Sequence, residues 1–436
     1  MMAEDSSAVL KMLLLSVLLF LAAADACLFP KECLPRDKYP TDCCPLYPPG
    51  TGSICGMNDG RGTCVSTSTS RADPDLYDDD RAGFPRAYFR TRCQCNNNFS
   101  GYNCGSCKLG FKGDRCDQPN VMVHKDYREM SPTQQEHLKV QMNYCKDLMD
   151  PRYYMLQAGD RTRSTTFSFM NGSYYDVWVS NMHYSSQPVM WDGEMTNMNM
   201  ISRSSAFLNS IKQAVLCLQE QMQSCLGDNT FAMPYDDWQT DSGCDLCTDY
   251  HFGASDQQGY LSLFNVFSSW RAVCADYAYD GTYCETSKSS CERTKLTRRA
   301  GMAPGITKPT TADIQRCINM TSLDTQPYST SSRDSFRNCV EEMYWRWRQY
   351  MGGTMSEDAL AYNDPMVPLA MVFIMKIQER WMSFQKIPPN FYPRDNPNYG
   401  HRYGDCCMPS FSCTLNGNMM VPLAQSNMYF TGFNGF

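Results

Sequence analysis

The stretch Ser204–Cys225, SSAFLNSIKQAVLCLQEQMQSC, decides the fold of the larger part of the chain. Its apolar residues recur at steps of three and four, which is the spacing of one face of an α-helix. They are Phe207, Ile211, Ala214, Val215, Leu218 and Met222. The spacing predicts an amphipathic helix that buries this stripe in a helical core. No imidazole, hydroxyl or carboxylate interrupts the stripe, so it offers no group for catalysis.

The amino-terminal sequence and the cysteine count indicate an exported protein. Lys11 precedes the apolar run Met12–Ala24, and Ala24-Asp25-Ala26 fits a cleavage site, so residues 1–26 are predicted to be a signal peptide. The 24 cysteines are then expected to form disulfides. Sequons predict glycosylation at Asn98, Asn171 and Asn319. We therefore expect a secreted protein, either extracellular or in the lumen of the secretory pathway.

The charge balance argues against two classes of partner. The formal net charge is -7 and the sequence pI is about 5.4, which is the wrong sign for binding nucleic acid or anionic lipid. Lys295, Arg298 and Arg299 form the one notable basic cluster, and we interpret it as a solvated loop. After the signal peptide no apolar run reaches the length of a membrane span. The sequence thus predicts neither a nucleic-acid partner nor a membrane span.

Residues 27–118 are expected to form a small disulfide-rich subdomain. The spacing Cys93-x-Cys95, Cys104-x-x-Cys107 and Cys116 is typical of an EGF-like knot. Zinc at Cys104-x-x-Cys107 is an alternative, but an exported chain disfavours it. Cys27 is left over, and it pairs either with a distant cysteine or with another chain.

Residues 119–436 are expected to form a helical domain with long loops. Ser131-Pro132-Thr133-Gln134 is a helix start, with serine as N-cap and proline at the first position. Further helices are predicted over Phe336–Met351 and Pro365–Met382. Pro368 should distort the start of the last helix, and the segment after Pro388 reads as loop.

Several stretches resemble vertebrate tyrosinase and its related proteins, in the same order along the chain. The motifs are Cys93–Cys116, Asp228–Tyr235 (DNTFAMPY), Cys244–Asp249 (CDLCTD), Phe267–Trp270 (FSSW) and Asn363–Pro365 (NDP). The resemblance implies a mainly α, tyrosinase-like fold of the di-copper type, with a four-helix core preceded by the EGF-like subdomain. It also implies the disulfides Cys33–Cys43, Cys44–Cys64, Cys55–Cys93, Cys95–Cys104, Cys107–Cys116, Cys244–Cys247 and Cys274–Cys284.

In that family each of two copper ions is held by three histidines, because neutral imidazole suits copper in both redox states. The resemblance places these ligands, which we call the former ligand positions, on Met182, Ser202, Ile211, Tyr344, Arg348 and Met371. None is histidine, and the chain has only five histidines in all. We therefore expect no enzyme, no metal site and no cofactor. The predicted function is that of a pseudoenzyme with a structural or binding role, whose partner is an unknown protein or matrix component, an active family member being one candidate.

Individual residues leave further alternatives. Arg348 is expected either to be exposed or in a local ion pair, or to replace the metal through an ion pair with Glu341, Glu342 or Glu379. His183 should miss the old centre, because a slip of one residue turns a helical side chain by about 100°. Methionines at the former ligand positions, and the cluster Met190, Met195, Met198 and Met200, are interpreted as core filling, with Cu(I) binding as the alternative.

Two other functions remain open from the sequence. One is a copper-dependent oxidoreductase, similar to a phenol or diphenol oxidase and related to pigment, with an atypical centre built from methionine, His183 and Tyr344. The other is a carrier of a small apolar ligand in the vacated copper pocket.

Overall fold

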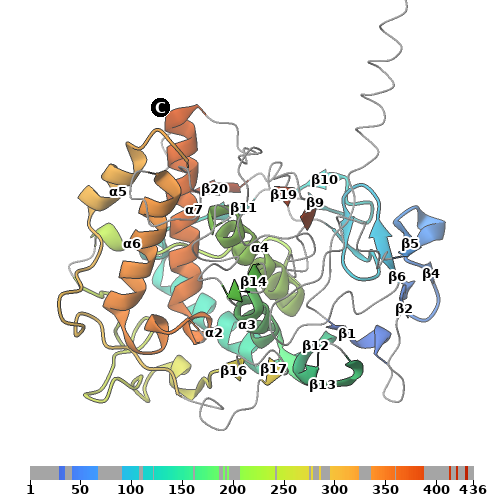
Figure 1. Ribbon diagram of the computed structural model, residues 1–436, viewed down its shortest axis with the longest axis horizontal. Coiled ribbons are helices and arrows are strands. Elements are labelled where there is room, and N and C mark those ends of the chain that lie inside the picture. Colours follow the sequence, from blue (N-terminus) through green and yellow to red (C-terminus); the bar gives the residue numbers. More distant parts are fainter. Residues whose placement is uncertain are drawn as a thin grey trace, which may run out of the picture.

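The structure is a computed structural model, in which the helices lie together and the short strands of the cysteine-rich part gather to one side of them (Figure 1). It describes residues 29–34, 42–66, 91–107, 111–120, 122–160, 163–185, 190–191, 194–195, 207–240, 243–273, 276–277, 284–285, 295–323, 335–358, 360–386, 412–413, 419–420 and 428–430. None of its described helices is both long and apolar enough to cross a bilayer.

Helix α4, Phe207–Leu226, is the centre of the helical part. The predicted stripe is buried along its whole length, from Phe207 to Met222. α4 packs against α3, Tyr174–Ser185, and α7, Met366–Gln385. It also contacts α2, Pro132–Asp147, and α6, Phe336–Met351. The indole Nε1 of Trp178 on α3 donates a hydrogen bond to the Ala214 carbonyl on α4, at 2.8 Å. The apolar periodicity of the sequence therefore predicted this packing correctly.

Helix α2, Pro132–Asp147, begins where the sequence predicted. Ser131 accepts a hydrogen bond from the Gln134 backbone N–H, and the Gln134 side chain accepts from the Ser131 N–H, which completes a capping box. The disulfide Cys145–Cys225 joins the last turn of α2 to the last turn of α4. This link holds α2 against the central helix.

Helices α5, Thr311–Ile318, and α6, Phe336–Met351, complete the helical part. Cys317–Cys339 joins them. α7 runs unbroken through Pro368, so the expected distortion is wrong. Pro368 lies in the first turn of α7, where backbone N–H groups have no partner within the helix and a proline removes nothing.

A long β-hairpin follows α2, where the sequence suggested a loop. Its strands are β12, Met149–Asp160, and β13, Arg163–Ser173, and β1, Phe29–Pro30, adds a third strand. The pairing of β12 with β13 shifts register at several points. Those irregularities break the alternation of apolar and polar residues by which a strand is recognised.

The cysteine-rich part is built on a three-stranded sheet of order β2-β6-β5. These strands are β2, Asp42–Cys43, β5, Gly62–Ser66, and β6, Thr91–Cys95. Around it lie three two-stranded pairs, β3–β4, β7–β8 and β9–β10: Leu46–Tyr47 with Ser53–Ile54, Phe99–Ser100 with Ser106–Cys107, and Phe111–Lys112 with Gln118–Pro119. Buried cysteines and Phe99 form its small core.

The remaining elements are short. The two-residue and three-residue strands are β11 Met122–His124, β14 Met190–Trp191, β15 Glu194–Met195, β16 Asp276–Tyr277, β17 Cys284–Glu285, β18 Ser412–Cys413, β19 Met419–Met420 and β20 Met428–Phe430. The 3-10 helices are η1 Lys31–Cys33, η2 Met57–Asp59, η4 Tyr127–Glu129, η5 Trp238–Thr240, η6 Val266–Ser269, η7 Gly353–Ser356 and η8 Ala361–Asn363. We expected the segment after Pro388 to be loop, but β20 pairs with β11, so that expectation is wrong for residues 428–430.

Candidate functional site

The former ligand positions that the structure describes lie on four helices. Met182 is on α3, Ile211 on α4, Tyr344 and Arg348 on α6, and Met371 on α7. All five side chains are buried, with at most 4% of each residue exposed. The ring of Phe207 on α4 lies 6.2 Å from that of Tyr344. Ser202 lies outside the described residues.

Arg348 is buried and makes a local ion pair. Its Nη1 lies 2.8 Å from Oδ1 of Asp358, and its Nε donates to the Met355 carbonyl at 2.9 Å. The Asp358 side chain is 64% exposed, so the pair reaches from the core to the surface. Nη2 of Arg348 is buried and has no hydrogen-bond partner among the described residues. Of the two alternatives for this residue, the structure has the local pair.

The glutamates considered as partners of Arg348 are engaged elsewhere. Glu341 pairs with Arg337 one turn earlier on α6. Glu379 on α7 accepts from Lys212 on α4 at 2.6 Å. An arginine–glutamate pair at the centre of the bundle is therefore wrong for these two residues. Asp358 lies in the turn after α6, a position that spacing on the helix could not reveal.

Tyr344 keeps its phenolic proton. Its hydroxyl oxygen is buried and has no hydrogen-bond partner among the residues described. Burial is the main cause that raises the pKa of Tyr344 well above its ordinary value, since a phenolate would have to leave water. Tyr344 is therefore a neutral phenol at any physiological pH.

These side chains do not fit the copper pair that the family resemblance implies. Ile211 has no donor atom, the Arg348 guanidinium is a cation, and Tyr344 is protonated. Only the thioether sulfurs of Met182 and Met371 are soft donors. An imidazole-ligated copper pair thus has none of its ligands among the described former ligand positions.

The histidines that the structure describes in full lie on separate elements. His137 is exposed on α2, and the His251 Nδ1 lies 3.2 Å from the Tyr127 hydroxyl. His124 on β11 is buried, and its Nδ1 lies 2.6 Å from the Met233 carbonyl. The His183 side chain and His401 lie outside the described part of the chain.

His124 should make stability depend on pH. Burial, and then the charge of Lys212, lower the pKa of His124 from 6.5 to about 4, while the Met233 carbonyl acts in the other direction. Between pH 6.5 and 4 the unfolded chain therefore binds a proton that the folded chain does not. We expect the unfolding free energy to fall by about 3 kcal/mol across this window from this residue alone.

This dependence can be measured by chemical denaturation at a series of pH values. His124→Asn should flatten the curve between pH 6.5 and 4, because an amide can donate to Met233 but does not titrate. The matched control, His137→Asn, changes an exposed histidine and should leave the curve as it is. Equal slopes for the native chain and His124→Asn would contradict the assignment.

One member of the basic cluster is buried where we expected a solvated loop, since Lys295 and Arg299 are exposed but Arg298 is not. Arg298 and Asp364 are both fully buried and paired, with Nε to Oδ2 at 2.7 Å and Nη2 to Oδ1 at 2.9 Å. The solvated-loop interpretation was therefore wrong for Arg298, because a run of like residues does not show which of its members faces inward.

The described disulfides include six of the seven pairs that the resemblance implied. They are Cys33–Cys43, Cys44–Cys64, Cys55–Cys93, Cys95–Cys104, Cys107–Cys116 and Cys244–Cys247. For the seventh, Cys274 lies outside the described residues, as do Cys27 and Cys291. Zinc at Cys104 and Cys107 is wrong, because both sulfurs are in disulfides. The sequence did not pair Cys145–Cys225 or Cys317–Cys339.

The three predicted glycosylation sites differ in their surroundings. Asn171 and Asn319 are exposed. Asn98 is half-buried, and its side-chain nitrogen donates to the Cys116 carbonyl at 3.0 Å. A glycan on Asn98 would replace a hydrogen of the amide that makes this contact.

No protein-family model matches the chain. Tyrosinase from Oryzias latipes is 29% identical to it, over 90% of this chain and 78% of that protein. The 5,6-dihydroxyindole-2-carboxylic acid oxidase of Mus musculus is 28% identical over 90% of this chain and 80% of that protein. The chain is thus similar to tyrosinase and to this oxidase over 90% of its length. The resemblance seen in the sequence motifs is thereby confirmed.

Solved structures similar to this tyrosinase relative are more distant. Recombinant mushroom tyrosinase is 11% identical, with a TM-score of 0.43 over 74% of this chain and 63% of that chain. A polyphenol oxidase from Thermothelomyces thermophila is 13% identical, with a TM-score of 0.42 over 64% of this chain and 74% of that chain.

Two expectations from the sequence are corrected by the comparisons. We expected a protein that is not an enzyme and that uses no cofactor. The relatives of this tyrosinase-like chain are named as a tyrosinase and as a carboxylic acid oxidase, which are enzymes, and the family resemblance implies copper in them. The missing imidazoles test only a histidine-ligated copper pair, so they do not establish that catalysis or metal is absent.

Proposed function

We propose that this tyrosinase relative has a structural or binding role outside the cytosol. The observation that carries the proposal is the packing of the former ligand positions. Met182, Ile211 and Met371 are each 0% exposed, and the charge of Arg348 is paired with Asp358. Side chains that fill an interior and hold four helices together serve the stability of a frame.

The frame itself follows the family arrangement in this proposal. α3, α4, α6 and α7 would correspond to the four helices of the family core, and residues 27–118 to its EGF-like subdomain. Residues 1–26 would direct export, and Asn171 and Asn319 would carry glycans on exposed positions. The many disulfides support an oxidising compartment. The partner would be a protein or matrix component, with an active family member as one candidate.

Oxidation of a phenol at an atypical metal site is the second candidate. The names of the relatives favour it, and Met182 and Met371 supply soft donors on two of the helices. Carriage of a small apolar ligand is less well supported, because the described former ligand positions are filled by their own side chains.

Metal analysis together with an oxidase assay separates the two candidates. Protein purified from the medium of secreting cells would be desalted, its copper content measured, and oxygen uptake followed with catechol before and after incubation with Cu(II). A structural or binding role gives copper well below one ion per chain and no uptake above that of free copper. Tightly held copper with turnover that is lost in Met182→Leu and Met371→Leu would overturn the proposal in favour of the oxidase.

A further inference from the structure

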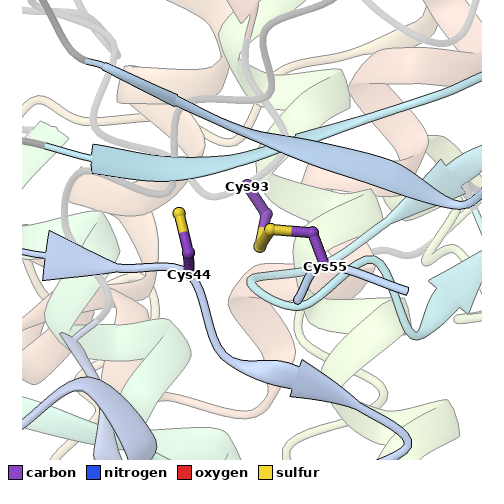
Figure 2. Close-up of side chains that lie close together, drawn as sticks. All are labelled: Cys44, Cys55 and Cys93. Carbon is purple, nitrogen blue, oxygen red and sulfur yellow. A yellow bond between two sulfur atoms is a disulfide. The ribbon is translucent and has the colours of Figure 1, made fainter. Parts of the chain in front are cut away.

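Two disulfides of the cysteine-rich part lie close together, and Figure 2 shows the Cys44 side chain of one of them beside the other. One is Cys55–Cys93, and the other joins Cys44 to Cys64. The sulfur atoms of Cys44, Cys55 and Cys93 all lie within 4.8 Å of one another. Cysteine binds a metal ion as a thiolate, and these sulfurs are already bonded in disulfides. The cluster is therefore better suited to thiol–disulfide exchange than to metal binding.

The sheet explains why these sulfurs gather. β6 is the middle strand of the order β2-β6-β5, and Cys93 lies directly opposite Cys64 in the antiparallel β5–β6 pair. On the other side, Cys44 directly follows Cys43, which pairs with Arg92. Opposite residues in an antiparallel pair have Cβ atoms about 4.5–5.5 Å apart, close to the separation that a disulfide spans. A Cys64–Cys93 bond therefore fits the existing register.

The four cysteines differ in access to solvent. Cys64 is exposed, whereas Cys55 is 0% and Cys93 7% exposed. Thiol–disulfide exchange starts with a thiolate that reaches one sulfur of a disulfide. An external thiol can therefore reach Cys64 but not the Cys55–Cys93 bond.

We propose that Cys64 is a site of attack by a small external thiol, and that this attack rearranges the two disulfides. The external thiolate bonds to the Cys64 sulfur, and Cys44 leaves as a thiolate. The Cys44 thiolate attacks the neighbouring Cys55 sulfur, which forms Cys44–Cys55 and releases Cys93 as a thiolate. The Cys93 thiolate then attacks Cys64 across the strands, which forms Cys64–Cys93 and releases the external thiol.

The sequence of exchanges is balanced. Each step breaks one sulfur–sulfur bond and forms one, and the thiol is regenerated, so neither an oxidant nor a reductant is consumed. The exchange changes what the cross-links connect. In the described structure the segment from Cys44 to Cys55 is tied to both β5 and β6; afterwards it is closed on itself, and β5 is tied directly to β6. The segment from Cys44 to Cys55 is then freer to move, and β5 and β6 are joined directly by a disulfide.

Peptide mapping under non-reducing conditions can follow the exchange. The full secreted protein would be incubated at neutral pH with reduced glutathione, alkylated at intervals, denatured, freed of N-glycans and digested with trypsin. In the described pairing, tryptic peptide 39–61 is linked to both 62–71 and 93–108. After exchange, 62–71 should be linked directly to 93–108 without 39–61. We expect the first species to be lost in step with the rise of the second.

Two paired variants make the test specific. Cys44→Ala/Cys64→Ala removes the entry point, so glutathione should leave Cys55–Cys93 intact. Cys33→Ala/Cys43→Ala removes an adjacent disulfide that takes no part, so the exchange should proceed as in the native chain. If a variant is not secreted, the map of the native chain decides alone. Alkylation of Cys44 and Cys64 with Cys55–Cys93 unchanged, or no reaction with glutathione, would overturn the proposal.

Discussion

Replacement of Arg298 by methionine should lower the free energy of unfolding by about 3–5 kcal/mol. Arg298 and Asp364 are both fully buried, and two parallel contacts join them at 2.7 and 2.9 Å. Arg298 Nη1 also donates to the Phe252 carbonyl at 2.6 Å. Methionine would leave the Asp364 carboxylate in the core without its countercharge, which is the expensive way to break a buried pair.

The effect can be read from the midpoint of thermal or denaturant unfolding with the disulfides intact. Arg299→Met is the matched control, because Arg299 is the next residue and is exposed, and its side chain donates only to the Gln258 carbonyl among the hydrogen bonds described. It should change stability by no more than about 0.5 kcal/mol. A similar shift for both variants would show that the buried pair is not the cause.

Arg348→Met offers a second comparison at a former ligand position. Arg348 is buried like Arg298, but its partner Asp358 is 64% exposed and can be solvated once the arginine is gone. The carboxylate then pays no burial penalty, and the buried Nη2 without a partner disappears as well. We expect Arg348→Met to lower the free energy of unfolding by about 2 kcal/mol less than Arg298→Met does.

The sequence predicted the elements whose signals are local. The stripe from Phe207 to Met222 gave α4 and its buried face, because helical periodicity is written directly into the residue order. Ser131 with Gln134 gave the start of α2, because a capping box spans a single turn. Both signals need no knowledge of the rest of the chain.

Contacts between distant segments were beyond such signals. Arg298 and Arg299 are the same residue type side by side, yet one is buried against Asp364 and the other is exposed. Asp364 belongs to the Asn363–Pro365 motif that pointed to the family, and its partner 66 residues earlier could not be inferred from it. The loop before α5 packs against the start of α7, and this packing decides which of the two arginines is buried.

The candidate site was predicted by resemblance and not by local pattern. The resemblance placed Ile211 and Met371 among the former ligand positions, and the structure buries both on helices that pack together. It could not give the partner of Arg348, because Asp358 lies in a turn outside the helical spacing. The resemblance also could not show whether the protein binds a metal. The loss of histidines from these positions does not tell which other side chains could act as metal ligands.

Removal of the Cys145–Cys225 disulfide, by Cys145→Ala/Cys225→Ala, should lower the free energy of unfolding by about 4.5 kcal/mol. The two cysteines are 80 residues apart, so their bond closes a long loop in the unfolded chain. The entropy that the cross-link removes from the unfolded state rises with the logarithm of loop length, which gives this estimate. The bond also joins α2 to α4, the helix that carries Ile211, so its loss should loosen the candidate site before the rest.

Cys244→Ala/Cys247→Ala is the matched control, because that disulfide closes a separation of only 3 residues. Loop closure then predicts a loss of about 2 kcal/mol, clearly below that of the long link. Denaturant midpoints of the two double variants give the comparison, and hydrogen exchange along α2 and α4 locates the loosening. Equal losses for the two variants would mean that strain or packing, and not loop closure, sets the value of these cross-links. Unchanged hydrogen exchange in α4 would show that the Cys145–Cys225 disulfide does not stabilise the candidate site. A disulfide that stabilises the site must slow the local opening of α4, the helix to which it is bonded.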